Sequence, residues 1–232
     1  MVYYRDMRQF AYEISQAALN LVFPILCQGC GKNLPYQSKI YLCRDCFEKL
    51  KLNSPSLCTL ANENSFFKHA WHCYSYEGFI KKLVRKFKYH RKLCLKNTLA
   101  ELLYEFTTNC IRYQDIDIIT SVPMHISDEK KRGFNQSDVL AKELSLRLNV
   151  VYAKGSIIKQ KRTDKQISLK KTERLKNLKG AFVPGNTTSF MGKDVLLIDD
   201  VFTTGTTINE CSRILSKNGA NSVSVLTLTK GI

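Results

Sequence analysis

The sequence has few acidic residues and no long apolar run. Only 20 Asp and Glu accompany 36 Lys and Arg, which gives a formal net charge of +16 over 232 residues. No stretch of about 18 consecutive apolar residues occurs, so no membrane-spanning helix is expected. A signal peptide is not expected either, because Asp6 and Glu13 interrupt an N-terminal apolar pattern that has helical spacing.

The common glycine motifs of nucleotide-binding proteins are also missing. The sequence contains no G-x-x-x-x-G-K-[ST] and no G-x-G-x-x-G. Internal repeats and low-complexity segments are absent too. These absences argue against a P-loop or a dinucleotide-binding domain.

The positive charge is concentrated in two stretches. Residues 79–96 contain eight Lys or Arg and no acid, and residues 154–179 contain ten with two acids, so the two stretches hold half of all the basic residues. This clustering favours a polyanionic partner: nucleic acid, an anionic membrane surface or a phosphorylated ligand. A lysine excess that only aids solubility is the alternative, and clustering argues against it.

Four of the nine cysteines form a metal-binding pattern. Cys27 and Cys30 form one C-x-x-C pair, and Cys43 and Cys46 form a second pair after twelve residues. Each pair presents two thiolates from a tight turn, so the two turns predict a tetrahedral structural Zn²⁺ site with no place for a catalytic water. A redox dithiol is the alternative, but such sites lie on a βαβ unit. The odd cysteine number and the missing export signal indicate reduced thiols and a cytoplasmic protein, with a peripheral position at the inner face of the membrane as a further option.

The hydrophobic pattern changes near residue 60. The first part predicts one amphipathic helix that ends near Pro24, followed by the cysteine-bearing segment. Beyond it, strands expected at 73–76, 116–122, 151–158, 195–198 and 223–228 alternate with helices expected at 79–89, 93–109, 138–148 and 207–217. This alternation predicts an α/β domain with a mainly parallel sheet flanked by helices. We therefore expect a zinc-binding module over residues 1–60 and an α/β domain over residues 61–232.

The end of the predicted strand at 195–198 carries the strongest functional signal. Two carboxylates, Asp199 and Asp200, lead into a loop of hydroxyl groups and one glycine: Thr203, Thr204, Gly205, Thr206 and Thr207. Free helix amides and hydroxyl groups can bind a phosphate, and the carboxylates can accept hydrogen bonds from vicinal sugar hydroxyls. A plain capping box of Thr207 and Glu210 is the alternative, but it leaves the two acids unexplained.

This segment resembles the phosphoribosyl-diphosphate (PRPP) signature of type I phosphoribosyltransferases. The resemblance implies that the acidic pair holds the ribose hydroxyls and that the loop from Thr203 to Thr207 holds the 5-phosphate. It also implies the phosphoribosyltransferase-like fold and a Mg²⁺ ion bound with PRPP.

Further sequence motifs make the family resemblance more specific. They are Val122-Pro123-Met124-His125, Lys131-Arg132-Gly133-Phe134-Asn135-Gln136, Lys161-Arg162-Thr163-Asp164-Lys165-Gln166, Arg174, Asn177 and Gly180-Ala181-Phe182. With the cysteine pairs and the acidic loop, this order is similar to the ComF family of bacterial competence proteins. That resemblance implies a competence accessory protein that supports DNA uptake in natural transformation and binds single-stranded DNA, with other DNA-uptake proteins as partners.

The basic helix expected at 79–89 agrees with a DNA partner. Five cations lie off its apolar stripe and can neutralise phosphates, and Phe134 can stack on a base; the cations are Lys81, Lys82, Arg85, Lys86 and Lys88. The alternative to DNA binding is that these cations only form a solvated helix face. The second functional hypothesis is an active phosphoribosyltransferase with an unidentified acceptor, in which Arg132 and Lys131 meet the departing pyrophosphate. The arginines usual before Arg-Gly-Phe-Asn-Gln in the family are replaced here by Asp128, Glu129 and Lys130, which weakens that expectation.

Overall fold

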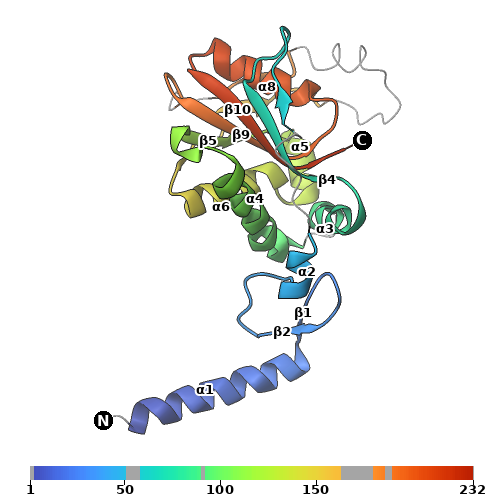
Figure 1. Ribbon diagram of the computed structural model, residues 1–232, viewed down its shortest axis with the longest axis vertical. Helices are drawn as coiled ribbons and strands as arrows, with labels where there is room; N and C mark the ends of the chain where they lie inside the picture. The colour runs from blue at the N-terminus through green and yellow to red at the C-terminus, as the bar shows by residue number, and fades with distance from the viewer. Residues whose placement is uncertain (1–2, 51–57, 90–91, 163–179, 186–189, 232) are drawn as a thin grey trace. The chain divides into compact units, whose positions relative to one another are not determined.

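The chain folds into two compact units. The computed structural model (Figure 1) describes residues 3–50, 58–89, 92–162, 180–185 and 190–231. Residues 1–51 form the first unit and residues 52–232 form the second. The boundary expected after residue 60 falls inside the second unit, because Thr59 and Leu60 pair with a strand of its sheet. Much of the second basic stretch, including the predicted motif residues from Thr163 to Asn177, lies outside the described residues.

The first unit contains the predicted N-terminal helix and the cysteine segment. Helix α1 spans Tyr3–Val22, and strands β1 (Ile25–Leu26) and β2 (Asn33–Leu34) form a short antiparallel pair. Helix α2 (Arg44–Glu48) is a single turn that begins directly after Cys43. Among the side chains of this unit whose burial the structure describes, the buried apolar ones are Leu34 and Leu42, together with Cys27 and Cys46.

The second unit is built on a six-stranded sheet with the order β3-β4-β10-β9-β5-β6. The strands are β3 (Thr59–Leu60), β4 (His69–Ser75), β5 (Ile118–Ser121), β6 (Val151–Tyr152), β9 (Asp194–Phe202) and β10 (Ser222–Lys230). All neighbouring pairs are parallel except β3 with β4. The structure therefore confirms the mainly parallel α/β sheet that the sequence predicts.

Helices and an antiparallel strand pair cover the two faces of the sheet (Figure 1). Helix α8 (Thr206–Lys217) and the antiparallel pair β7 (Ile157–Lys159) and β8 (Phe182–Pro184) pack on one face, in a core that contains Val195, Leu197 and Val225. Helices α4 (Lys96–Cys110) and α6 (Gln136–Leu148) pack against the other face. The remaining helices are α3 (Gly78–Tyr89), α5 (Ile126–Arg132) and the short 3₁₀ turns η2 (Leu93–Leu95) and η3 (Tyr113–Asp115).

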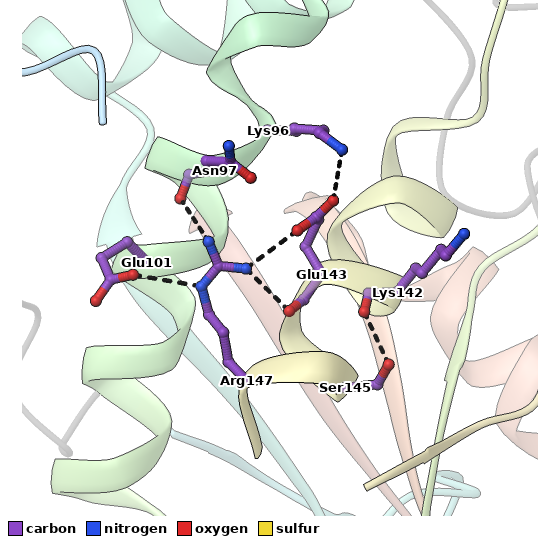
Figure 2. Close-up of polar contacts among 7 residues, drawn as sticks. All are labelled: Lys96, Asn97, Glu101, Lys142, Glu143, Ser145 and Arg147. Carbon is purple, nitrogen blue, oxygen red and sulfur yellow. Dashed lines mark hydrogen bonds and ion pairs between the residues drawn. The ribbon is translucent and has the colours of Figure 1, made fainter. Parts of the chain in front are cut away.

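A polar network joins α4 to α6 (Figure 2). The Arg147 guanidinium donates to Glu101 Oε2 (3.3 Å), to Glu143 Oε2 (3.2 Å) and to the carbonyl oxygens of Asn97 and Glu143. Lys96 Nζ pairs with Glu143 Oε1 at 2.7 Å. The same side chains hold the pKa of Glu143 below its usual value against the opposing effect of burial. This network fixes α6, whose first turn contributes to the site described below.

Several elements differ from the prediction. The strand expected at 151–158 is two short strands, β6 and β7, which belong to different sheets. Strand β9 continues to Phe202 through both acids, because β10 runs beside it as far as Lys230. Helix α5 lies between the strand expected at 116–122 and the helix expected at 138–148, where no element is predicted. His125 caps its first turn, and Gly133, with a φ of 93°, ends it. Helix α8 begins at Thr206 after Gly205, so the Thr207–Glu210 capping box does not form.

His72 is buried in the sheet, and its ring lies between the hydroxyl groups of Thr227 (2.8 Å) and Thr59 (3.2 Å). Of the cysteines outside the two C-x-x-C pairs, Cys94 is exposed, whereas Cys211 is buried. Within the described ranges, no helix has the length and the apolar content that crossing a bilayer requires.

Candidate functional site

The acidic pair lies at the carboxyl end of β9, the edge where parallel sheets bind ligands. Asp199 is half-buried, and its Oδ1 accepts hydrogen bonds from Ser137 Oγ (2.7 Å) and from the backbone N–H of Asp200 (2.8 Å). Ser137 is in the first turn of α6, so this helix orients the Asp199 carboxylate. Asp200 is buried and pairs with Lys88 Nζ at 2.8 Å.

The electrostatics of the pair set its protonation. Burial and the neighbouring Asp200 carboxylate raise the pKa of Asp199 to about 7, against the opposing effects of Ser137 and Lys88. Burial alone lowers the pKa of Lys88, but the attraction of Asp200 and Asp199 outweighs it and the pKa of Lys88 is raised. The Asp199 carboxyl of this pair therefore titrates near neutral pH.

Lys88 therefore lies in the acidic site. It is on the last turn of α3, and its side chain is 16% exposed, so it reaches inward to Asp200 instead of outward with its neighbours. Its assignment to a DNA-binding surface stays a prediction, and in this structure its ammonium group contacts the acidic pair.

The threonine loop connects the acids to the first turn of α8. Gly205 has a φ of 72°, and a Cβ atom there would lie 2.7 Å from the Phe202 ring, so the turn requires glycine. Thr203 and Thr204 are exposed, and Thr204 Oγ1 lies 3.0 Å from Thr206 Oγ1.

The amides of the first α8 turn are open to a ligand. Among the described side chains none caps this helix, and the acid of the predicted capping box, Glu210, instead binds Arg213 at 2.6 Å. A helix N-terminus without a cap presents free amides and a partial positive charge, which is a suitable place for a phosphate group.

The Arg132 to Gln136 run joins β5 to the acidic site. Asn135 caps α6 through its side chain and donates to the carbonyl oxygen of Val122 (3.0 Å) at the end of β5. Arg132 donates to the Gln136 side chain and lies 5.5 Å from the centre of the Tyr89 ring. Lys131 is exposed on α5. The two basic residues predicted to meet pyrophosphate thus follow the strand next to β9.

Phe134 packs on α3. Its ring lies 5.2 Å from the Phe87 ring at an interplanar angle of 51°, and Phe87 is fully buried. One side of the Phe134 ring is therefore occupied by the protein, and its predicted stacking on a DNA base stays a prediction. On the opposite side of the same helix, Lys81, Lys82 and Arg85 are exposed and Lys86 is partly exposed.

The four predicted metal ligands come together in the first unit. The Sγ atoms of Cys27, Cys30, Cys43 and Cys46 all lie within 4.8 Å of one another. Cys27 Sγ accepts backbone hydrogen bonds from Gly29 (3.4 Å) and Cys43 (3.3 Å), and Cys30 Sγ lies 3.7 Å from Cys43 Sγ. Four converging thiol groups with amide donors around one of them suit a tetrahedral ion such as Zn²⁺, so the donor set fits the predicted metal.

Local hydrogen bonds already favour one thiolate in this cluster. Burial raises the pKa of Cys27, but the backbone donors of Cys30, Cys43 and Gly29 outweigh it and lower this pKa to about 6. Burial and the neighbouring thiols raise the pKa of Cys46 to about 12. A divalent cation at the centre would reverse that second effect, because metal coordination deprotonates thiols.

Sequence reasoning missed two members of the acidic site. Ser137 is 62 residues from Asp199, and no local pattern connects them. The inward position of Lys88 was equally hidden, although its place at helical spacing from the buried Val84 puts it near the apolar face of α3.

Comparison with known proteins agrees with these features. A family model for the phosphoribosyl transferase domain matches residues 130–231, which include α6, β9, the threonine loop and α8. The chain is 29% identical to Competence protein F of Haemophilus influenzae over 226 residues, which cover 90% of this chain and 98% of the relative. It is 29% identical to Competence protein ComFC of Bacillus subtilis over 215 residues, which cover 88% and 78% of the two chains.

A third relative matches a shorter region. The DNA utilization protein YhgH of Escherichia coli is 32% identical over 154 residues, which cover 64% of this chain and 66% of the relative. Three findings agree with the resemblance that the sequence motifs indicate. They are the matched domain, the competence relatives that align over most of the chain, and the four-cysteine cluster. The chain is therefore similar to competence and DNA utilization proteins, and its residues 130–231 match the phosphoribosyl transferase domain.

Proposed function

We propose that this protein is an accessory factor of DNA uptake that binds a PRPP-type sugar phosphate and single-stranded DNA. The observation that carries the sugar-phosphate part is the placement of Asp199, Asp200 and the Thr203–Thr207 loop at one strand end, directly before an uncapped helix. The names of the relatives, competence and DNA utilization proteins, support the role in DNA uptake.

In this proposal the phosphate and the sugar bind to different chemical groups. The 5-phosphate accepts hydrogen bonds from the α8 amides and the threonine hydroxyl groups, and the ribose hydroxyls donate to Asp199 and Asp200. A Mg²⁺ ion bound with PRPP would neutralise its pyrophosphate charge. Lys88 sets how much negative charge the acidic pair presents to the sugar, because it pairs with Asp200.

The single-stranded DNA part rests on α3. Its outward side carries Lys81, Lys82, Arg85 and Lys86 and the helix has no acid in its first turn, so it offers a row of cations for a phosphate backbone. The four-cysteine cluster has no role in this chemistry; in the proposal it holds a structural Zn²⁺ that stabilises the first unit. The partners are single-stranded DNA and other DNA-uptake proteins in the cytoplasm, including its membrane boundary.

An active phosphoribosyltransferase is the second candidate function. A hollow of about 200 Å³ opens beside the end of β5, and its lining includes Pro123, Asn135 and Glu129. Glu129 is on α5, the helix that also carries Lys131 and Arg132. The hollow offers room for a leaving group or an acceptor. Catalysis there would depend mainly on positioning and on cations near the departing pyrophosphate.

Calorimetric titration with PRPP and Mg²⁺ tests the sugar-phosphate site. We expect Asp199→Asn with Asp200→Asn to weaken PRPP binding at least about tenfold, because each lost charged hydrogen bond costs roughly 1.5–3 kcal/mol. A matched control, Glu63→Gln with Asp115→Asn, removes two exposed acids elsewhere and should bind as the wild type does. Equal PRPP affinity in both variants would rule out the ribose assignment.

The same titration, repeated with an oligothymidylate and then with both ligands, separates the two candidate functions. Independent or mutually enhanced binding, without pyrophosphate release, supports the accessory role. Pyrophosphate release from PRPP that depends on an added amine or nucleobase and is lost in Arg132→Gln supports the transferase.

A further inference from the structure

A cleft of about 510 Å³ opens at the amino ends of the sheet strands, the edge opposite to the acidic pair. Its walls come from the starts of β4, β9 and β10 and from the segment that follows α4. The volume falls within the range of about 300–1,000 Å³ that small-ligand sites occupy. None of the residues of the sugar-phosphate site contributes to it.

The only tryptophan of the chain lines this cleft. Trp71 pairs with Leu226 in the parallel register, so it shares a sheet face with Ser224 and Ser222 two and four residues earlier. The ring of His69 is stacked on Trp71, with centroids 5.2 Å apart and planes 28° apart. Both rings are half-buried, so the wall of the cleft contains a two-ring aromatic platform beside hydroxyl groups.

Two cations border the same platform. Lys68 precedes the aromatic pair on the chain, and Arg112 approaches from the end of α4; both are exposed, and neither forms an ion pair within the described part of the chain. Of the two acids in the lining, Asp194 already accepts hydrogen bonds from Asn221 (2.9 Å) and Ser222. Asp115 is the remaining acid, at the C-terminal end of η3.

We propose that this cleft binds one nucleotide of single-stranded DNA, with its base stacked on the Trp71–His69 platform and its phosphates held by Lys68 and Arg112. An aromatic face beside unpaired cations is the chemistry that single-strand-binding proteins use, and it tolerates any base because every base has a π-face. The proposal rests on the proposed binding of single-stranded DNA and gives it a second contact surface, on the edge of the sheet away from the sugar phosphate. Both ligands can therefore be bound at once.

The single tryptophan makes the test direct. Stacking of a base on Trp71 should quench the intrinsic fluorescence of the full-length protein when an oligothymidylate is added. Because no other tryptophan exists, the quenching reports this cleft alone. The titration is repeated with PRPP present and in the Asp199→Asn, Asp200→Asn variant, and the quenching should be the same in each.

Variants separate base stacking from charge. In an anisotropy assay with a labelled oligonucleotide, Trp71→Leu should weaken binding at least about fivefold, the lower end of the loss for one base stack, and Trp71→Phe should restore most of it. Lys68→Gln with Arg112→Gln should weaken binding and reduce the tryptophan quenching at a given DNA concentration. Lys142→Gln with Lys217→Gln removes the same charge from exposed positions outside the cleft and should change binding less.

The outcomes distinguish this inference from the function on which it rests. Loss of binding in Trp71→Leu and in the Lys68, Arg112 variant, together with quenching in the wild type, supports the cleft. DNA binding without quenching, or equal binding by Trp71→Leu and wild type, overturns the cleft and leaves the α3 surface as the DNA site. Quenching by a free mononucleotide but not by the oligonucleotide also overturns it, and no DNA binding by any assay overturns both proposals.

Discussion

At the scale of single residues, Lys88 and Asp200 form an ion pair that is largely buried in the second unit. Its two side chains are 16% and 11% exposed, and the atoms are 2.8 Å apart. The pair is local to the acidic site, where Asp199 already carries a raised pKa. Removing one partner of such a pair leaves a buried charge without compensation, which costs much more than the pair itself contributes.

We therefore expect Lys88→Met to lower the free energy of unfolding by about 3 kcal/mol, the lower end for a broken buried pair. Lys96→Met is the matched control: it breaks the Lys96–Glu143 pair, whose lysine is 39% exposed, and should cost less than about 1 kcal/mol. Urea denaturation followed by Trp71 fluorescence measures both. Adding Asp200→Asn to Lys88→Met should recover part of the loss, and unchanged stability of the single variant would contradict the pairing.

His72 and Asp199 predict opposite pH dependences. Burial, with a smaller contribution from Lys230, lowers the pKa of His72 to about 4. Between pH 4 and 6.5 the unfolded chain therefore binds a proton that the folded chain does not bind, so stability rises with pH. The pKa of Asp199, in contrast, is raised to about 7. Between pH 4 and 7 the folded chain therefore keeps a proton that the unfolded chain has lost, so stability falls as pH rises. Each effect has a limit of about 1.4 kcal/mol per pH unit.

The two slopes oppose each other in the wild type. We expect the difference in free energy of unfolding between Asp199→Asn and wild type to become more favourable to the variant as pH rises from 4.5 to 6.5. For His72→Gln the same difference should become less favourable to the variant over this range. Urea midpoints from Trp71 fluorescence at several pH values measure this, since that side chain reports the second unit only. Parallel pH profiles for the three proteins would show that neither group titrates as the structure indicates.

At the scale of elements, the two sides of α3 differ in character. Its buried residues are Ile80, Leu83, Val84 and Phe87, and its last turn delivers Lys88 to the acidic site. The other cations point away from that core. One helix thus links the proposed DNA surface to the acidic site.

Neutralising the outward cations of α3 should reduce the salt dependence of DNA binding. Each lost contact to single-stranded DNA lowers the slope of log K against log salt by about 0.7, so Lys81, Lys82, Arg85 and Lys86 changed to Gln should lower it by at most about 3. Anisotropy titrations over a range of salt concentrations measure the slope. The control changes Lys39, Lys49, Lys142 and Lys217 to Gln, four exposed lysines outside α3, and should affect it less. Equal slopes in the two variants would place the main DNA contact outside α3.

At the scale of the whole molecule, the two units depend on different forces. The second unit has an apolar core on both faces of its sheet, whereas the side chains described in the first unit include few buried apolar ones and four converging thiols. A segment of about 50 residues with so small a core usually needs a metal or a cross-link to fold.

We therefore expect metal removal to unfold the first unit alone. A strong chelator should make residues 1–51 sensitive to protease while the urea midpoint reported by Trp71 stays the same. Co²⁺ added back should give the absorption of a four-thiolate tetrahedral site, and Cys43→Ser should weaken it. A joint loss of both units on chelation would contradict separate stabilisation.

Local patterns in the sequence were sufficient for much of this protein. Apolar periodicity predicts α3, α4, α6 and α8, because a helix that packs on a sheet must place its apolar residues on one side. The two C-x-x-C pairs predict a metal cluster, because ligands from one tight turn are close together in the sequence. The acidic pair and its threonine loop are likewise one continuous segment, so the strand end and the helix start could be expected together.

Tertiary structure alone decided which distant residues meet. Ser137 reaches Asp199, Lys88 reaches Asp200, and Trp71 shares a cleft with Ser224 because parallel strands and their crossover helices bring residues far apart in the chain to one sheet edge. No local period encodes such pairings, since they depend on strand order and register. The sequence determined the chemical groups and the elements that carry them, and the packing of those elements decided their partners, their protonation and the clefts between them.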